Sequence, residues 1–146
     1  MTLRSSVVFM AAALLFASAA APVSAQYRPK LVGVWKGTLS NGARVLPDDP
    51  TPTYYNALDP QLEITMTIIG QDDRSFHGVM GNHEEREYVV GVVREDGKTL
   101  LMADDDGYKS ATILTPSTME YCVQVASGDH MVAACGVLEK QAAEKN

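Results

Sequence analysis

Hydrophobic and polar residues alternate along most of the chain after residue 30, and turn residues interrupt this alternation about every eight to twelve positions. A period of two is typical of strands that bury one face. No segment has the period and length of a stable helix. The pattern therefore predicts eight strands, over Leu31–Leu39, Leu62–Ile69, Ser75–Met80, Glu85–Arg94, Thr99–Ala103, Tyr108–Thr115, Met119–Ala126 and Met131–Leu138.

Short turns join most of these predicted strands. Asp96-Gly97 and Asp106-Gly107 are typical of two-residue hairpins, because glycine tolerates the positive φ that such turns require. Hairpins in series form a meander with two exposed edges, and closure into a barrel removes both edges. We expect an all-β fold, a single eight-stranded antiparallel up-and-down barrel. A two-sheet β-sandwich built from the same meander is the alternative.

Residues 40–61 do not fit the alternation. They contain four prolines, with Tyr54 and Tyr55 between them. Loops of this length are usually functional or disordered. We expect a long irregular connection, in which the two tyrosines either form an ordered cover over the barrel or belong to a solvated loop without a function.

The first 25 residues have the features of a secretory signal peptide. Arg4 provides the positive start, Val7–Ala21 is apolar, and Val23-Ser24-Ala25 offers a cleavage site with small residues. The apolar run is shorter than the ~20 residues that span a membrane. We expect cleavage near Ala25 and one exported domain, periplasmic or secreted, over residues 26–146. An uncleaved anchor is the alternative, and no later segment approaches spanning length.

Charge and cysteine content narrow the possible partners. The 146 residues include 12 Lys and Arg against 18 Asp and Glu, with a net charge of −6 and no basic cluster. This composition excludes a nucleic-acid surface or an anionic-membrane surface. The two cysteines are too few for a four-ligand zinc site, but an exported chain can hold them as a disulfide. If Gly128-Asp129 is a two-residue turn, Cys122 and Cys135 lie directly opposite each other, and we predict a bond between them.

The same turn rule assigns an inner face to each predicted strand. Some of the side chains that it turns inward are polar, and polar groups among apolar walls are typical of a small-ligand cavity. A filled core is the alternative, and one β-bulge would reverse every face beyond it. The predicted polar inner residues are Arg86, Tyr88, Tyr108, Ser110, Thr112, Tyr121 and His77. The apolar ones include Val79, Val90, Val92, Leu62, Ile64, Met66, Ile68, Leu101, Ala103, Leu114, Val123, Val125, Val132, Ala134 and Leu138.

The first predicted strand contains Gly33-Val34-Trp35, and Lys140 follows the last one. This combination resembles the calycins, the group that contains lipocalins, avidins and fatty-acid-binding proteins. In that group the tryptophan closes one barrel end and a basic residue packs across it, which implies these roles for Trp35 and Lys140. The single tryptophan departs from avidins, whose biotin site needs several. Exported bacterial metalloprotease inhibitors have a similar barrel with one disulfide, so the resemblance also permits an inhibitor.

Three segments have residue types that are found in catalytic or metal sites. The segment His83–Glu87 lacks the second histidine of a zinc helix, and Asp104–Gly107 lacks the remaining ligands of a calcium loop. We interpret them as a solvated strand start and an acidic hairpin turn. Ser127–His130 is contiguous in a turn, so its side chains point apart rather than converge as a triad. The sequence therefore assigns no catalytic residue, no metal ligand and no cofactor.

These observations lead to an expected function. We expect an exported, non-enzymatic barrel that binds a small, partly polar ligand near Tyr88, Tyr108 and Tyr121, under the loop with Tyr54 and Tyr55. Arg86 would suit an anionic group on that ligand, because its planar donors match carboxylates. The alternative is a protein-binding module, such as an inhibitor of an exported hydrolase, which would use the proline-rich loop or the N-terminal segment.

Overall fold

The computed structural model describes residues 28–46, 48–55, 63–81, 86–105, 107–126 and 131–143. The predicted signal peptide lies outside these residues. Within the described part no helix is long and apolar enough to cross a membrane. The regular structure there consists of β1 (Gly33–Leu46), β2 (Asp49–Tyr55), β3 (Glu63–Asp72), β4 (Ser75–Gly81), β5 (Arg86–Val93), β6 (Thr99–Asp104), β7 (Gly107–Thr115), β8 (Thr118–Ala126) and β9 (Met131–Lys140).

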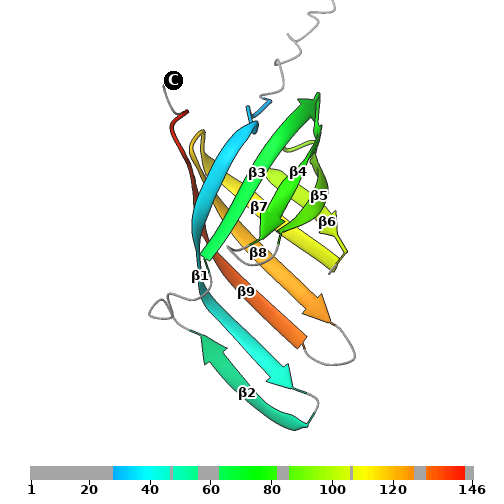
Figure 1. Cartoon of the computed structure of the whole chain (residues 1–146), viewed down its shortest axis with the longest axis vertical. Coiled ribbons are helices and arrows are strands. Elements are labelled where there is room, and N and C mark those ends of the chain that lie inside the picture. The colour runs from blue at the N-terminus through cyan, green and yellow to red at the C-terminus, as the bar shows by residue number, and fades with distance from the viewer. Residues whose placement is uncertain are drawn as a thin grey trace, which may run out of the picture.

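Eight of these strands form a closed barrel (Figure 1). Strands β3 to β9 pair in sequence, each antiparallel to the next, and β1 pairs with both β3 and β9. The β1–β9 pairing closes the ring, so the predicted up-and-down barrel is confirmed and the sandwich alternative is wrong. β1 begins and β9 ends at the same end of the barrel.

The ninth strand, β2, occupies the segment that we predicted as an irregular connection. β1 continues to Leu46 instead of ending at Leu39, and its second half pairs with β2. The predicted loop is therefore wrong for residues 40–46 and 49–55, while residues 56–62 lie outside the described part. Prolines 50 and 52 weakened the strand pattern, but β2 is the edge strand of the sheet, where a missing N–H is tolerated.

The predicted disulfide is confirmed. Cys122 on β8 and Cys135 on β9 are direct cross-strand partners, with their Cα atoms 4.1 Å apart, and their sulfurs are bonded.

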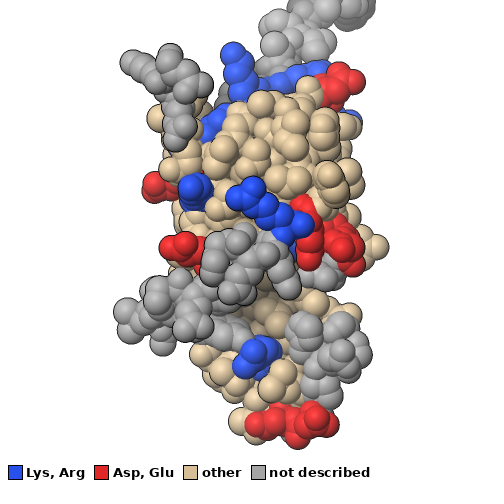
Figure 2. Space-filling model, viewed as in Figure 1, with Lys and Arg blue, Asp and Glu red and all other residues tan. Residues whose placement is uncertain are grey.

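The barrel interior around Trp35 is filled by apolar side chains. Phe76 and Gly91 show how closely they pack, because a Cβ on Gly91 would lie 2.3 Å from Cζ of the Phe76 ring. On the face shown in Figure 2, an uncharged area lies over β3 and β4. Charged side chains lie above and below this area. The most deeply buried core residues include Leu31, Trp35, Met66, Ile68, Val89, Val93, Leu100, Met119, Tyr121 and Leu138.

The predicted inner faces are correct on β3, β8 and β9 but wrong on β4 to β7. A bulge between Ile113 and Thr115 shifts the pairing of β7 with β8 by one residue. Since a shift of one residue turns every side chain to the other face, Lys109 faces inward and Tyr108 faces outward. A second bulge, between Ile68 and Gly70, reverses the faces again where β4 meets β3.

Candidate functional site

One end of the barrel is closed around Trp35. The Trp35 ring is 1% exposed, and its Nε1 donates a hydrogen bond to the carbonyl of Leu31 at 2.8 Å. The Lys140 ammonium lies 5.3 Å from the ring centroid and donates to the carbonyl of Lys30 at 2.7 Å. Gly33, at a φ of +134°, leaves room for the lysine stem, since a Cβ there would lie 3.0 Å from Cε of Lys140. This is the arrangement that the resemblance to calycins implies.

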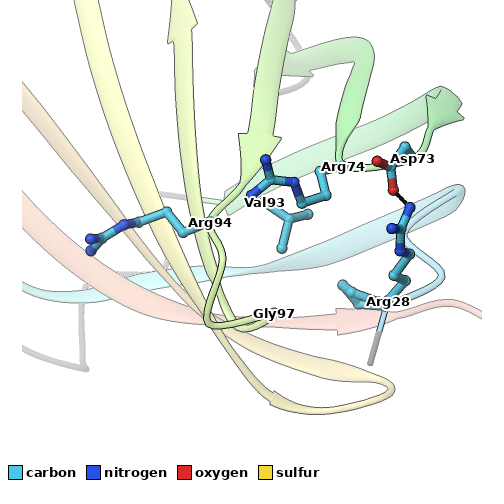
Figure 3. Close-up of a pocket in the computed structure, with 7 residues that line it drawn as sticks. Arg28, Asp73, Arg74, Val93, Arg94 and Gly97 are labelled. Atoms are coloured by element: carbon cyan, nitrogen blue, oxygen red, sulfur yellow. Dashed lines mark ion pairs between the residues drawn. The ribbon is translucent and has the colours of Figure 1, made fainter. Parts of the chain in front are cut away.

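Polar contacts complete this end. The Gln71 side chain accepts from the N–H of Leu31 at 2.9 Å and donates to the carbonyls of Pro29 and Asp73. Arg28 forms an ion pair with Asp73, beside a pocket of about 10 Å³ from which Arg94 points away (Figure 3). A volume of this size holds about one water molecule. A larger hollow of about 580 Å³ lies outside this end, and four of the polar side chains that line it, Arg28, Gln71, Asp73 and Lys140, already have these partners.

The structure does not bring the predicted ligand-binding tyrosines together inside the barrel. Tyr121 is buried as expected, but Tyr88 and Tyr108 are 84% and 78% exposed on the outer wall. The predicted interior position is therefore wrong for these two residues, because the bulge between Ile113 and Thr115 reverses their strands. Within the described part, the remaining five residues of the predicted ligand site do not line an interior cavity either. Arg86, Thr112 and Tyr54 are exposed, Ser110 is half-buried, Tyr55 pairs through its backbone with Gly42, and the Tyr55 side chain lies outside the described part.

A groove opens in the outer wall where β5 and β6 separate. The ladder between them ends at the pair Val90 and Ala103, and the first half of β5, Arg86–Val89, continues beyond it. The groove has a volume of about 500 Å³. Two of its residues, Arg86 and Tyr88, belong to the predicted ligand site. The complete lining is Arg86, Glu87, Tyr88, Val90, Ala103, Asp104 and Asp105.

Three carboxylates meet at this groove. Glu87, Asp104 and Asp105 each place one oxygen within 4.8 Å of the others. The Asp104 side chain has no exposed surface, and one of its oxygens accepts a hydrogen bond from the buried ammonium of Lys109. Its other oxygen, Oδ2, is also buried and has no hydrogen-bond partner in the part of the chain that the structure describes. A buried acceptor without a partner is costly, and such atoms are uncommon in folded proteins.

Tyr121 lies on the interior side of this cluster. Burial, followed by the negative charges of Asp104 and Glu87, raises the pKa of Tyr121 well above its usual value. Its hydroxyl donates to the sulfur of Met80 at 3.5 Å. The phenol therefore stays protonated across the physiological pH range. The negative charges of Asp104 and Glu87 act on this buried hydroxyl inside the barrel.

Both halves of this cluster are present in the sequence, but each half alone is a weak signal. Glu87 ends the segment that we interpreted as a solvated strand start, and Asp104 and Asp105 begin the acidic turn. The hairpin at Asp96-Gly97 has the register that the turn rule predicts, and it brings the start of β5 against the end of β6. That register is the signal that would have joined the two segments. Residues 83–85, 106 and 127–130 lie outside the described part.

Neither a family model nor a curated protein matches this chain. Among solved structures, one described as a redesigned beta barrel covers 77% of this chain and 92% of its own, with 9% identity and a TM-score of 0.42. The fold assignment given above rests on the strand pairing, not on this likeness.

Proposed function

We propose that this protein is an exported, non-enzymatic binding barrel of the calycin type, and that its ligand occupies the groove between β5 and the end of β6. The observation that carries the proposal is the groove itself. Its volume of about 500 Å³ lies in the range of small-molecule sites, which combine apolar walls with a few polar groups.

The lining of the groove indicates the chemistry of the ligand. Tyr88, Val90 and Ala103 supply an apolar wall, and the exposed tyrosine ring can stack on a flat group or face a cation. The carboxylates of Glu87, Asp104 and Asp105 outnumber the guanidinium of Arg86. We therefore propose a ligand that carries positive charge, in place of the anionic group that Arg86 alone suggested.

Two features away from the groove support the calycin type and export. Trp35 under Lys140 has the placement that calycins use to close a barrel end. The bond between Cys122 and Cys135 is of a kind that persists in oxidising compartments.

Native mass spectrometry of the protein purified from its own host tests the proposal. We expect a small molecule to co-purify, and to be lost from a Tyr88→Ala variant. Tyr108→Ala is the matched control, because Tyr108 is a similarly exposed tyrosine on the same wall but outside the groove. A protein without any bound small molecule, or equal loss from both variants, would contradict the proposal.

A protein-binding module is the second candidate, and the outer wall of β5, β6 and β7 favours it. Ladder pairs place Val92 beside Leu101, and Ala103 between Val90 and Tyr108. Of these, all but Ala103 are large, exposed hydrophobic residues, and contiguous exposed apolar surface often marks an interaction site. For an exported protein partner, the same mass spectra would show a stoichiometric complex, weakened by Tyr108→Ala as well as by Tyr88→Ala.

A further inference from the structure

The first half of β5 is an open edge within the barrel wall. β5 pairs with β4 from Arg86 onward, but its ladder with β6 ends at the pair Val90 and Ala103. On the side of β6, the backbone of residues 86–89 therefore has no strand partner in the part of the chain that the structure describes. An open strand edge is a template that another extended chain can pair with.

The neighbouring hairpin leaves room beside this edge. β6 and β7 turn back at the pair Asp104 and Gly107, and the ladder of β7 with β8 begins at Tyr108 and Gln124. β8 continues beyond that pair to Ala126. In Figure 1, β8 and β9 accordingly extend past the ends of β6 and β7. The hairpin thus stops short of both neighbouring strands, and the groove of about 500 Å³ lies on the β5 side of this gap.

Backbone hydrogen bonds show which groups of β5 point to the open edge. The N–H of Val93 donates to the carbonyl of Arg74 at 2.8 Å, on the side of β4. The N–H of Arg94 donates to the carbonyl of Thr99 at 2.8 Å, on the side of β6. N–H groups alternate between the two sides along a strand, and neither ladder of β5 contains a bulge. Tyr88 precedes Arg94 by an even number of residues, so its N–H and C=O point to the open edge.

Charges at the two ends of this edge favour one direction for an added strand. β6 runs antiparallel to β5 toward the turn at Asp105, so a chain that continues in the direction of β6 begins beside Asp105 and ends beside Arg86. Both side chains are exposed and line the groove. In this direction the ammonium of a peptide N-terminus faces a carboxylate, and the C-terminal carboxylate faces a guanidinium. The reverse direction pairs like charges at both ends, which is unfavourable.

We propose that this edge binds a short extended peptide with free ends, antiparallel to β5 and with its N-terminal ammonium beside Asp105. The inference rests on the proposed function and deepens it, because it makes the positively charged ligand of the groove a peptide. In strand addition the backbone hydrogen bonds, here to Tyr88, supply affinity, and side-chain contacts supply specificity. Tyr88 and Val90, both exposed, favour aromatic or β-branched residues on the outer face of the peptide.

A five-residue peptide of alternating valine and threonine, with both ends free, is the probe. Its length suits the open edge, since four residues of β5 span about 13 Å. At saturating peptide we expect the N–H of Tyr88 to exchange with deuterium about tenfold more slowly. The N–H of Val90, which already lies in the ladder with Ala103, is the matched reference and should not change. Hydrogen exchange followed by NMR measures both.

Two methylated forms of the probe test the backbone hydrogen bonds. Alternate N–H groups of an added strand face β5, and the others face away from it. Methylation of the set that faces β5 should weaken binding about tenfold or more, because each methyl group removes a hydrogen bond. Methylation of the other set should leave the affinity nearly unchanged.

Asp105→Asn tests the direction of the peptide, because this side chain is exposed and the fold does not depend on burying it. We expect it to weaken binding of the probe about threefold, as for an exposed ion pair. Asp72→Asn is the matched control, an exposed aspartate where β3 ends at the other end of the barrel, and it should bind the probe like the wild type.

Three results would overturn the inference. The first is unchanged exchange of the Tyr88 N–H at millimolar probe, and the second is equal binding of the two methylated forms. The third is slower exchange of this N–H at rising protein concentration without any probe, which would assign the edge to a second copy of the chain. If the probe does not bind but a small molecule is still lost from Tyr88→Ala, the inference fails while the proposed function stands. If the probe binds as expected and no ligand co-purifies, the peptide edge stands without the rest of the proposed function.

Discussion

The two ends of the barrel each use a lysine, and they use it differently. At one end Lys140 lies over Trp35 and donates to a backbone carbonyl, so its partners are neutral. Toward the other end Lys109 is buried against Asp104, with two more carboxylates beside them. The first lysine finishes a packed structure, whereas the second only partly balances an acidic cluster. The comparison separates a lysine packed among neutral groups from a lysine buried against a carboxylate.

Replacing Trp35 with alanine should have the largest effect on stability. Trp35 is 1% exposed at the closed end of the barrel. Removing a buried aromatic side chain usually costs about 3–5 kcal/mol of unfolding free energy. Urea unfolding measures this loss. Val32→Ala, at a half-exposed position of the same end, should change the free energy by less than about 1 kcal/mol. A Trp35→Ala variant as stable as Val32→Ala would show that this end is not held by its tryptophan.

Lys109→Met separates the acidic cluster from its ammonium. The side chains of Lys109 and Asp104 are 8% and 0% exposed, so the variant leaves a buried carboxylate without its counter-ion. We expect a loss of about 3 kcal/mol at neutral pH. Urea unfolding measures the loss, and a Lys109→Met variant as stable as the wild type would mean that Asp104 does not depend on Lys109.

Lys140→Met is the corresponding change at the other end. It removes a cation–aromatic contact and one hydrogen bond, together about 1 kcal/mol. Burial lowers the pKa of Lys140, so removing the charge also relieves an unfavourable desolvation and reduces the net loss. Unfolding of the two lysine variants in parallel should therefore show a clearly smaller loss for Lys140→Met. Equal losses would remove the distinction between the two ends.

Tyr121→Phe should have a small effect at neutral pH, about 1 kcal/mol or less, because it removes one buried hydrogen bond from the hydroxyl to the sulfur of Met80. The pKa of Tyr121 is raised in the folded state, so the folded protein keeps this proton when the unfolded chain loses it. That contribution is complete below about pH 10, the ordinary tyrosine value, and is lost as the pH rises further. Above about pH 10, the unfolding free energy of the wild type should therefore fall more steeply with pH than that of the Tyr121→Phe variant. Urea unfolding at a series of alkaline pH values measures both. Parallel curves would show that neither burial nor the neighbouring carboxylates raise the pKa of Tyr121.

The sequence predicted the barrel well because closure depends on strand count and turn chemistry, which are local. It predicted the disulfide because one two-residue turn sets the register of Cys122 and Cys135. The inner faces failed at two bulges, and each bulge carries an apolar doublet. Leu114 follows Ile113, and Ile69 follows Ile68, and the second member of each doublet is more than half exposed. Alternation cannot assign both members of such a doublet, although the doublet itself marks where the register changes.

The site was harder to predict, because its parts lie in two segments that are weak signals separately. Glu87 and Asp104 are adjacent only through the register of β5 with β6. The partnerless oxygen of Asp104 depends on burial, which no local pattern in an acidic turn indicates.

The edge strand β2 has a consequence for how copies of this protein meet in concentrated solution. It covers the second half of β1, and prolines at positions 50 and 52 leave this edge strand with fewer N–H groups for pairing with another chain. A variant without residues 47–55 would leave the backbone of residues 42–46 open to pairing on that side. We expect such a variant to keep the ring of eight strands and to become prone to intermolecular sheet formation, because β2 covers a backbone edge that would otherwise be open.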